Sequence, residues 1–564
     1  MTFPSPYKQL ELPTYSVPEF IFAKGRDRTD VPVCLPSHVS SRPEAQPLSN
    51  KDIEENSIAL ANALLAHDAE GGPWEKGQVA LFYSENQHDF LQVALGVILA
   101  GGVPALLNPQ YKAAELEHVL KQINPRALIV SKASLPHAQE ALQLYGKELP
   151  YVLYEEDAEH SYHKLLEKGR ELVANGSQAH TSVSFSPATD VAIYCFSSGT
   201  SGLPKVVQLS HANIVANIIQ STVMLGGRVN KPTFDPAGWY DQPYGVPQDG
   251  ENELHISFLP QFHCYGLIMS LVSMHTATPN VIFSRFSVEH ILQSVEQNRA
   301  TFMFVVPPIV LALATMFTDK YDVSSLKSVA SGAASLSREL RELLTSRRGI
   351  KITDGYGMTE MSPIISMQTV RDLDRSDTRN VGQLAPNTVA RVVDVNTGKD
   401  VGPNEDGELW LTGPQMMLGY LNNAEADAST FTDDRKFLKT GDIVRIDNDG
   451  YISIRDRLKD TIKYNGFQVA PSELEAYISS FPGVLDVAVV GKPEVTNSVH
   501  NELPWAFIIP EDGNLSDERS KEVIDYVNER VAGYKKLRGI TWTKELPRSA
   551  AGKILKRELR ASFK

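Results

Sequence analysis

The chain has 564 residues, of which 42% are hydrophobic and 22% charged, and its formal net charge is −14. This length is too great for one core and suggests about three or four structural units. The composition excludes fibrous and disordered classes, and the acidic balance without a long Lys/Arg run disfavours binding to nucleic acid.

The cysteine content and the two ends of the chain indicate the cellular compartment to expect. Cys34, Cys195 and Cys264 are widely spaced and form no C-x-x-C pair, so we expect reduced thiols and neither a disulfide framework nor a zinc site. The first residues show no secretory signal, and the last are not a peroxisomal S-K-L. The uncharged run 300–318 contains a proline pair, which favours a strand, a break and a buried helix over a membrane span. We therefore expect a cytoplasmic protein.

The first half of the chain alternates strand and helix patterns after a proline-rich, irregular start at residues 1–47. The expected elements are a helix from Ser49 to Ala66, a strand at 78–84, a helix at 87–100, a helix carrying Leu116 to Ile123 and a strand at 127–130. Such alternation predicts an α/β fold with a mostly parallel sheet covered on both faces by helices.

Residues 226–253 are rich in Gly, Pro and Asp and lack periodicity, which predicts a long surface insertion. A passive loop is favoured there over a lid or a partner contact.

A stretch of small polar residues has the pattern of a phosphate-binding loop. The apolar run 191–196 predicts a buried strand, and it is followed by serines, a threonine, glycines and Lys205. Ser210 then caps a predicted helix. Glycines let the backbone approach a ligand, hydroxyl and N–H groups donate to phosphate oxygens, and a lysine balances their charge. An ordinary flexible loop is the alternative, and the sequence is not a Walker A motif.

Several later segments carry residues of chemical interest. They are 258–267, with a histidine among aromatic residues; the small-residue run 331–336; 354–360, reading DGYGMTE; the strand-rich stretch 407–420; 440–442, reading TGD; the charged run 455–469; and the lysine-bearing turn at 547–556. Taken singly, each has a plain alternative, such as a core histidine, a solvated carboxylate, an exposed linker or a solvated lysine.

Taken together, in this order and at these intervals, the segments resemble the signatures of the acyl-activating (adenylate-forming, AMP-binding) enzyme superfamily. The pattern is most similar to 4-coumarate-CoA ligase-like acyl-CoA synthetases, and the resemblance extends from about Leu48 to Arg560. The chain departs from the family pattern at a few positions. Ser201 stands where the family usually has Thr, Val206 where it has Gly, and Ser335 where it has Pro. Asp354 stands where the family usually has Gln or Asn, and Asn465 where it often has Lys.

The resemblance implies the domain organisation. It predicts a large N-terminal domain of mixed, mostly parallel sheets flanked by helices with a strand-rich subdomain (1–456), a hinge (457–459) and a small, mobile α+β C-terminal domain (460–564).

It also implies the ligands and the residues that hold them. The cofactors would be ATP, Mg²⁺ and CoA as acceptor, with Glu360 and Thr200 as metal ligands, since Mg²⁺ prefers oxygen donors. Asp442 would accept from both ribose hydroxyls. The full set implied for nucleotide and CoA is Ser197, Ser198, Gly199, Thr200, Ser201, Gly202, Lys205, Arg285, Gly332, Ala333, Asp354, Gly355, Tyr356, Thr359, Asp442, Arg457, Asn465, Gly466 and Gln468.

By the same resemblance, Lys553 serves adenylation, Lys459 is the hinge pivot and Lys463 serves thioester formation, with His263, Thr200 and Glu360 completing the catalytic set. The matching acyl-pocket positions are Cys264, Tyr265, Met269, Gly332, Gly357, Ile364, Ile365 and Met367. They are small or apolar, which favours a hydrophobic monocarboxylic acid (aryl, cinnamoyl-like or medium-chain aliphatic) and disfavours amino acids.

The implied reaction is ATP-dependent formation of an acyl-adenylate, followed by transfer to CoA with release of AMP. The alternatives are an acyl-AMP ligase that loads the phosphopantetheine of a carrier protein, a luciferase-like oxygenase, and a non-catalytic nucleotide-binding module. A serine hydrolase is disfavoured because no G-x-S-x-G occurs.

Overall fold

The computed structural model describes the chain except for a set of short segments and one long one. The residues outside the description are 24–29, 38–43, 67–71, 156–159, 199–203, 226–252, 316–319, 333–335, 337, 370–379, 459, 461, 465–466, 497–498, 512–515, 532, 550–552 and 564. The predicted surface insertion therefore lies outside the described residues except for its last position, Glu253.

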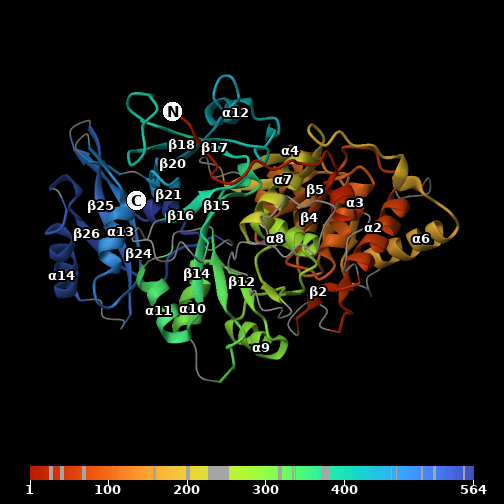
Figure 1. Ribbon diagram of the computed structural model, residues 1–564, viewed down its shortest axis with the longest axis horizontal. Coiled ribbons are helices and arrows are strands. Elements are labelled where there is room, and N and C mark those ends of the chain that lie inside the picture. The colour runs from red at the N-terminus through yellow and green to blue at the C-terminus, as the bar shows by residue number, and fades with distance from the viewer. Residues whose placement is uncertain are drawn as a thin grey trace.

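A seven-stranded sheet forms one half of the N-terminal part, on the right of Figure 1. Its order is β19-β9-β8-β5-β4-β6-β7, and β4 to β8 run parallel. The strands are β4 (Val79–Tyr83), β5 (Val103–Leu107), β6 (Ala127–Val130), β7 (Tyr151–Leu153), β8 (Val191–Ser198), β9 (Pro204–Ser210) and β19 (Gly419–Tyr420). Its helices are α2 (Asn50–Leu64), α3 (Phe90–Leu99), α4 (Ala113–Ile123), α5 (Leu135–Tyr145), α6 (Tyr162–Ala174) and α7 (His211–Met224), with a 3-10 turn η1 (Ala179–Ser182).

A fourteen-stranded mixed sheet forms the other half. Its order is β1-β17-β18-β20-β21-β16-β15-β14-β13-β12-β10-β11-β2-β3. The strands are β1 (Phe3–Pro4), β2 (Pro32–Pro36), β3 (Leu48–Ser49), β10 (His255–Ser257), β11 (Asn280–Ile282), β12 (Phe302–Val305), β13 (Ser328–Ser331), β14 (Lys351–Gly357), β15 (Ile364–Met367), β16 (Asn380–Leu384), β17 (Val389–Val393), β18 (Asp406–Thr412), β20 (Leu438–Ile446) and β21 (Tyr451–Arg457). The accompanying helices are α1 (Val17–Ile21), α8 (Cys264–His275), α9 (Val288–Asn298), α10 (Pro307–Thr315), α11 (Arg338–Arg348) and α12 (Ala424–Thr430), with the 3-10 turn η3 (Thr359–Met361).

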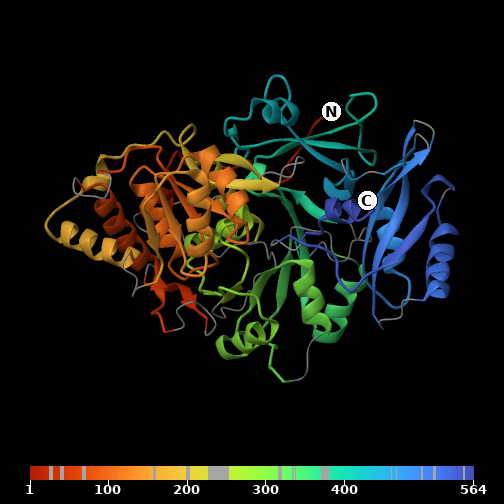
Figure 2. The ribbon, with the colours of Figure 1, turned by 180° about the vertical axis from the view of Figure 1, so that it is seen from behind.

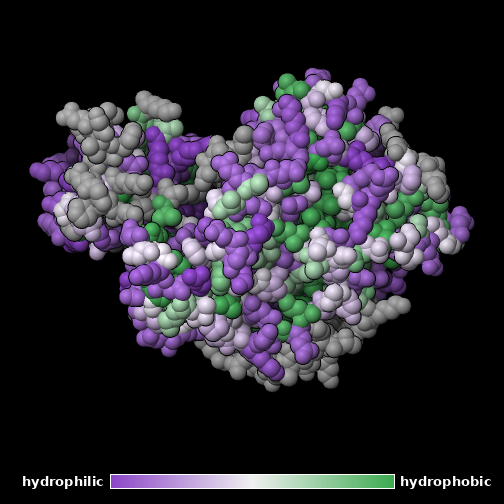
Figure 3. All heavy atoms as spheres, turned by 90° about the horizontal axis from the view of Figure 1, so that it is seen from above, coloured by the Kyte–Doolittle hydropathy of each residue, from purple (hydrophilic) through white to green (hydrophobic). Residues whose placement is uncertain are grey.

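The C-terminal part has its own small core, seen as the blue region of Figures 1 and 2. A three-stranded sheet, β24-β25-β26, and the hairpin β22–β23 pack with helices. The elements are β22 (Ile462–Tyr464), β23 (Phe467–Val469), α13 (Pro471–Ser479), β24 (Val484–Thr496), β25 (Val499–Pro510), α14 (Asp517–Asn528), η5 (Gly533–Lys535), β26 (Gly539–Trp542) and α15 (Lys556–Ala561). In the view from above, hydrophilic side chains predominate on this part, at left, and hydrophobic ones show in the middle of the N-terminal part (Figure 3).

Most element predictions are confirmed. Ser49 and Ser210 each cap a helix by accepting a backbone N–H three residues on. The proline-interrupted run at 300–318 forms the strand β12 and the helix α10, and within the described part of the chain no helix has the length and apolar character needed to cross a membrane. The three cysteines are buried free thiols, as expected.

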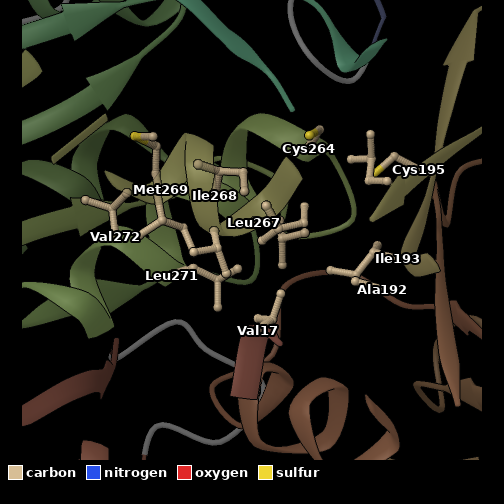
Figure 4. Close-up of a cluster of buried hydrophobic side chains, with 14 of the residues drawn as sticks. Val17, Ala192, Ile193, Cys195, Cys264, Leu267, Ile268, Met269, Leu271 and Val272 are labelled. Atoms are coloured by element: carbon tan, nitrogen blue, oxygen red, sulfur yellow. The ribbon is translucent and has the colours of Figure 1, made fainter. Parts of the chain in front are cut away.

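The prediction that residues 1–47 are irregular is wrong for the helix α1 and the strands β1 and β2. Helix α1 starts with a proline in its first turn, a position where the missing N–H costs nothing. Its Val17 is fully buried and lies below α8 and β8, close to Leu267, Ile193 and Ala192 (Figure 4). The N-terminal segment is therefore part of the main core.

Buried amides join the two sheets. Asn86, which follows β4, donates to the carbonyl oxygens of Leu259 (2.9 Å) and Phe283 (3.1 Å), which follow β10 and β11. Its own oxygen accepts from the Gln261 N–H at 2.7 Å. Asn86 is 5% exposed, so these three bonds are shielded from water. The carboxyl ends of both sheets are thereby held against each other.

Asn86→Ala should destabilise the protein by about 3 kcal/mol, because it leaves three buried backbone groups without partners. The measurement is the urea midpoint of the N-terminal transition. Asn298→Ala is the control, because Asn298 bonds only within its own helix at an exposed position. It should shift the midpoint by a small fraction of that change, and equal shifts for both variants would contradict the bridging role of Asn86.

Candidate active site

The predicted phosphate loop is the tip of a β-hairpin. Strands β8 and β9 pair antiparallel, with Ser197 opposite Lys205 and Ser198 opposite Pro204. The sequence predicted a strand, a loop, a lysine and a helix, but it did not predict the second strand, β9, between the loop and α7. Gly199, Thr200, Ser201 and Gly202 lie outside the described residues, and the description of Ser198 is limited to its backbone.

Tyr420 gathers several groups at the base of this hairpin. It lies on β19, which pairs with β9, and it is 7% exposed. Its hydroxyl donates to Glu360 Oε1 at 2.8 Å. The Lys205 ammonium lies 4.8 Å from its ring centroid. Sequence reasoning placed Tyr420 in the strand-rich subdomain and missed this role, and only a β19–β9 pairing could have indicated it.

The environment of Glu360 fits a magnesium ligand. The residue lies with Thr359 in the turn η3, both nearly buried, and its carbonyl accepts from the Met417 N–H at 3.0 Å. Among the described residues no cluster of three His, Cys, Asp or Glu side chains could hold a metal unaided. Mg²⁺ often binds through one carboxylate and the substrate's phosphates, so a single buried carboxylate beside a phosphate hairpin suits it.

Three side chains from separate strands meet at the predicted ribose position. Asp442 on β20 and Arg457 on β21 are register partners, and their Oδ1 and Nε atoms lie 3.0 Å apart. The Tyr356 hydroxyl, from β14, donates to Asp442 Oδ2 at 2.6 Å. Asp442 is 4% exposed, and its charge raises the pKa of Arg457 above the ordinary value. The carboxylate can accept from neighbouring sugar hydroxyls.

At the predicted base site the structure places a positive charge, Arg341, that the sequence did not indicate. Asp354 on β14 is the register partner of Ser331, the last residue of β13. Gly355 and Gly332, the residues that follow them, are therefore neighbours across the two chain segments. Ala333 lies outside the described residues. Arg341 from α11 pairs with Asp354 Oδ2. Burial nevertheless raises the pKa of Asp354 to about 6. Its Oδ1 is buried without a hydrogen-bond partner in the described structure, and therefore remains available to a ligand donor.

The residues of the predicted acyl pocket lie mainly on one helix and two paired strands. Helix α8 supplies Cys264, Tyr265 and Met269, and the β14–β15 pair supplies Gly357, Ile364, Ile365 and Met367. Except for Gly332 and Gly357, all belong to or pack against one buried apolar cluster. Gly357 is required because a Cβ there would lie 2.3 Å from the Pro363 carbonyl oxygen. At Gly332 a Cβ would lie 3.0 Å from Tyr265 Cε1, so the tyrosine ring covers that glycine.

His263 caps α8 at the edge of this pocket. Its Nδ1 accepts from the Tyr265 N–H at 3.3 Å, which fixes the orientation of the ring. Burial lowers the pKa of His263 to about 4, so the imidazole is neutral at physiological pH. It can therefore offer an uncharged N–H donor but no positive charge.

The C-terminal candidates are described in part. Lys553 comes directly after the undescribed residues 550–552, and its N–H donates to Ser549 Oγ at 3.2 Å. Lys463 and Gln468 are opposite each other on the β22–β23 hairpin, and only their backbones are described. Lys459, Asn465 and Gly466 lie outside the described residues. Arg285 is exposed on the bend after β11, away from the Asp442 cluster in sequence and strand order.

A cluster of charges surrounds the end of β21. Asp456 is 9% exposed, its Oδ1 accepts from the Arg457 N–H at 2.7 Å, and its Oδ2 is buried without a partner in the described structure. Burial raises the pKa of Asp456 to about 7, aided by Glu475 and Asp460 and opposed by Lys556. Lys556 pairs with Glu475 at 2.7 Å. A bond from the Ser472 hydroxyl to the Arg455 carbonyl joins β21 to the C-terminal part beside the predicted hinge.

Comparisons with known proteins bear on the family and the fold. Residues 30–421 match the model of the AMP-binding enzyme family, and residues 473–553 match that of the AMP-binding enzyme C-terminal domain. The chain is 31% identical to a probable 4-coumarate–CoA ligase 1 of Dictyostelium discoideum, over 99% of this chain and 97% of the relative. It is 33% identical to the peroxisomal OPC-8:0-CoA ligase 1 of Arabidopsis thaliana, over 86% of this chain and 84% of the relative. The fold is similar to that of ATP-bound MatB from Rhodopseudomonas palustris, with a TM-score of 0.79 at 24% identity over 97% and 98% of the two chains.

The raised pKa of Asp456 predicts a pH-dependent stability. A carboxyl group whose folded pKa exceeds its unfolded value stabilises the fold below about pH 4, and that contribution is lost as the pH rises through about 7. Asp456→Asn removes this loss. The stability of the variant relative to the parent should therefore be about 2 kcal/mol greater at pH 8 than at pH 5. Unfolding curves at both pH values test this, and the same parent-to-variant difference at both would contradict a raised pKa at Asp456.

Proposed function

The chain belongs to the AMP-binding enzyme family and is an AMP-forming acyl-CoA ligase, and from this premise we propose that it activates a hydrophobic monocarboxylic acid. The acid would be aryl, cinnamoyl-like or medium-chain aliphatic, and the products would be acyl-CoA, AMP and pyrophosphate. The proposed location is the cytoplasm.

The observation that supports the acid class most strongly is the composition and position of the pocket wall. Its side chains are apolar or small, and the same buried cluster includes Met361, the neighbour of Glu360. Tyr265 lies between this wall and the predicted base site, and its ring covers Gly332. Burial raises the pKa of Tyr265, and the nearby Asp354 charge raises it further. A hydrophobic acid held there has its carboxylate toward the nucleotide, while a second charged group would be desolvated without a partner.

In the first half-reaction, a carboxylate oxygen of the acid attacks the α-phosphorus of ATP and pyrophosphate leaves. Negative charge gathers on the phosphate oxygens, so positioned cations and donors contribute more than a protein nucleophile. Lys205, the hydroxyls of the hairpin and Lys553 provide these groups in our proposal, while Asp442 fixes the ribose. Mg²⁺ held by Glu360 and Thr200 would neutralise phosphate charge when bound.

In the second half-reaction, a thiol attacks the acyl carbon and AMP leaves. We propose that the C-terminal domain turns about Lys459 so that Lys553 leaves the site and the surface with Lys463, Asn465, Gly466 and Gln468 enters it. Arg285, exposed beside Phe286, would then meet the phosphates of CoA. Conformational exchange of this kind lets one domain serve both steps.

A panel of carboxylic acids tests the proposal. Each acid is offered with ATP and Mg²⁺, pyrophosphate is measured with and without CoA, and thioesters are identified by mass. Hydrophobic monocarboxylic acids should release pyrophosphate and amino acids should not. Release of pyrophosphate with no thioester from CoA would point to a different thiol acceptor, and no release with any hydrophobic acid would contradict the proposed activity.

Lys553→Ala should slow pyrophosphate release about 100- to 1,000-fold, because the variant loses a cation that acts in the adenylation transition state. Conversion of presynthesised acyl-adenylate to acyl-CoA should stay close to the parent rate, since Lys553 leaves the site for that step. Lys544→Ala, an exposed lysine of the same part of the chain, is the control and should leave both steps unchanged. Equal losses in both steps for Lys553→Ala would refute its assignment to adenylation.

Gly332→Ala should narrow the acyl pocket, because its Cβ would press on the Tyr265 ring at 3.0 Å. We expect kcat/KM for the best bulky acid to fall about tenfold, with a smaller loss for a short acid. Gly533→Ala, where a Cβ meets nothing within 4 Å, is the matched control. Parallel losses for bulky and short acids would place Gly332 outside the acyl pocket.

A further inference from the structure

Tyr420 connects two opposite charges of the nucleotide site through one side chain. Its phenol oxygen donates to Glu360 Oε1 at 2.8 Å, and its ring faces the Lys205 ammonium at 4.8 Å from the centroid. Ser197 is the register partner of Lys205 on the other strand of the hairpin. The proposed metal ligand and the lysine of the phosphate hairpin therefore contact a single residue.

The backbone around Tyr420 is fixed independently of any ligand. Its N–H donates to Asp427 Oδ1 at 2.8 Å, and the next residue, Leu421, donates to the Val206 carbonyl on β9 at 2.9 Å. The Met417 N–H holds the Glu360 carbonyl. With both backbones held, the hydroxyl–carboxylate bond decides which way the Glu360 side chain points.

The phenol is a neutral O–H donor, and in this structure it donates to Glu360 Oε1. A neutral donor on one carboxylate oxygen leaves the second oxygen for a metal. Mg²⁺ demands near-ideal octahedral geometry, so a carboxylate with a fixed orientation binds it better than a freely rotating one.

We propose that Tyr420 is a positioning residue for the magnesium–nucleotide complex: its hydroxyl orients Glu360 toward the metal while its ring holds Lys205 over the phosphates. This inference rests on the proposed function, because it takes Glu360 as the metal ligand. It assigns to the Gly419–Tyr420 strand a part in binding that goes beyond sheet formation.

The test is nucleotide binding without catalysis. The probe is α,β-methylene-ATP, which cannot release pyrophosphate, and its dissociation constant is measured by calorimetry in excess EDTA and in excess Mg²⁺. Tyr420→Phe keeps the ring and removes the hydroxyl. We expect its affinity in Mg²⁺ to fall at least tenfold, the usual effect of losing a group that orients a metal ligand, with affinity in EDTA unchanged.

Two further variants separate positioning from a general structural effect. The double variant Tyr420→Phe/Glu360→Gln should bind no more weakly in Mg²⁺ than Glu360→Gln alone, because the hydroxyl acts only through that carboxylate. Tyr83→Phe is the matched control: it loses a buried hydroxyl bond to the Tyr111 carbonyl in the same sheet and should bind the probe like the parent in both conditions.

Equal loss of affinity in EDTA and in Mg²⁺, an additive loss in the double variant, or no loss in Tyr420→Phe would each overturn the positioning role. These outcomes are independent of the acid. A parent that binds the probe with Mg²⁺ but releases no pyrophosphate with any acid would contradict the proposed function, whereas the Tyr420 experiment would still give its own answer.

Discussion

The ion pair between Asp442 and Arg457 is the interaction on which the nucleotide site depends. The two residues are register partners on adjacent strands, and Tyr356 donates to the same carboxylate from β14, on the far side of β15 and β16. A carboxylate that is 4% exposed is stable only when its lone pairs are occupied. The predicted ribose position, the strand of the predicted base site and Arg457, the first residue of the predicted hinge, are therefore held together by one buried charge.

Burial sets the protonation states around this pair. His263 is neutral because its pKa falls to about 4, and Asp354 keeps a pKa of about 6 despite its contact with Arg341. In our proposal, the positive charge that meets the triphosphate therefore comes from lysine and arginine side chains and not from His263. Apolar side chains fill the region behind them. This division suits a reaction that needs charge stabilisation at phosphorus and a dry pocket for the acid.

Local patterns predicted the elements, because helix and strand periodicity depend on neighbouring residues. Serine caps and the strand–helix alternation were recognised for that reason. The strand β9 was not predicted, since its short run of mixed residues follows a proline and lacks a clear period. The start of the chain was misjudged because its prolines suggested irregularity, whereas in α1 a proline opens a buried helix.

Contacts between distant segments could not be derived from the sequence. Tyr420 and Glu360 are 60 residues apart, and Arg341 reaches Asp354 only because α11 packs beside β14. Family resemblance supplied the positions of Glu360, Asp442 and Arg457, but it gave no partners for them. The described structure adds those partners: a phenol for Glu360, and a phenol and a guanidinium for Asp442.

The most direct measurement of the central claim follows one oxygen atom. A hydrophobic acid labelled with ¹⁸O in its carboxylate is incubated with the protein, ATP, Mg²⁺ and CoA, and the AMP is examined by mass spectrometry. If the carboxylate attacks the α-phosphorus, one labelled oxygen passes to each AMP when the thioester forms. AMP that forms with the thioester yet carries no label would show that no acyl-adenylate lies on the path, and would contradict the proposed two-step reaction.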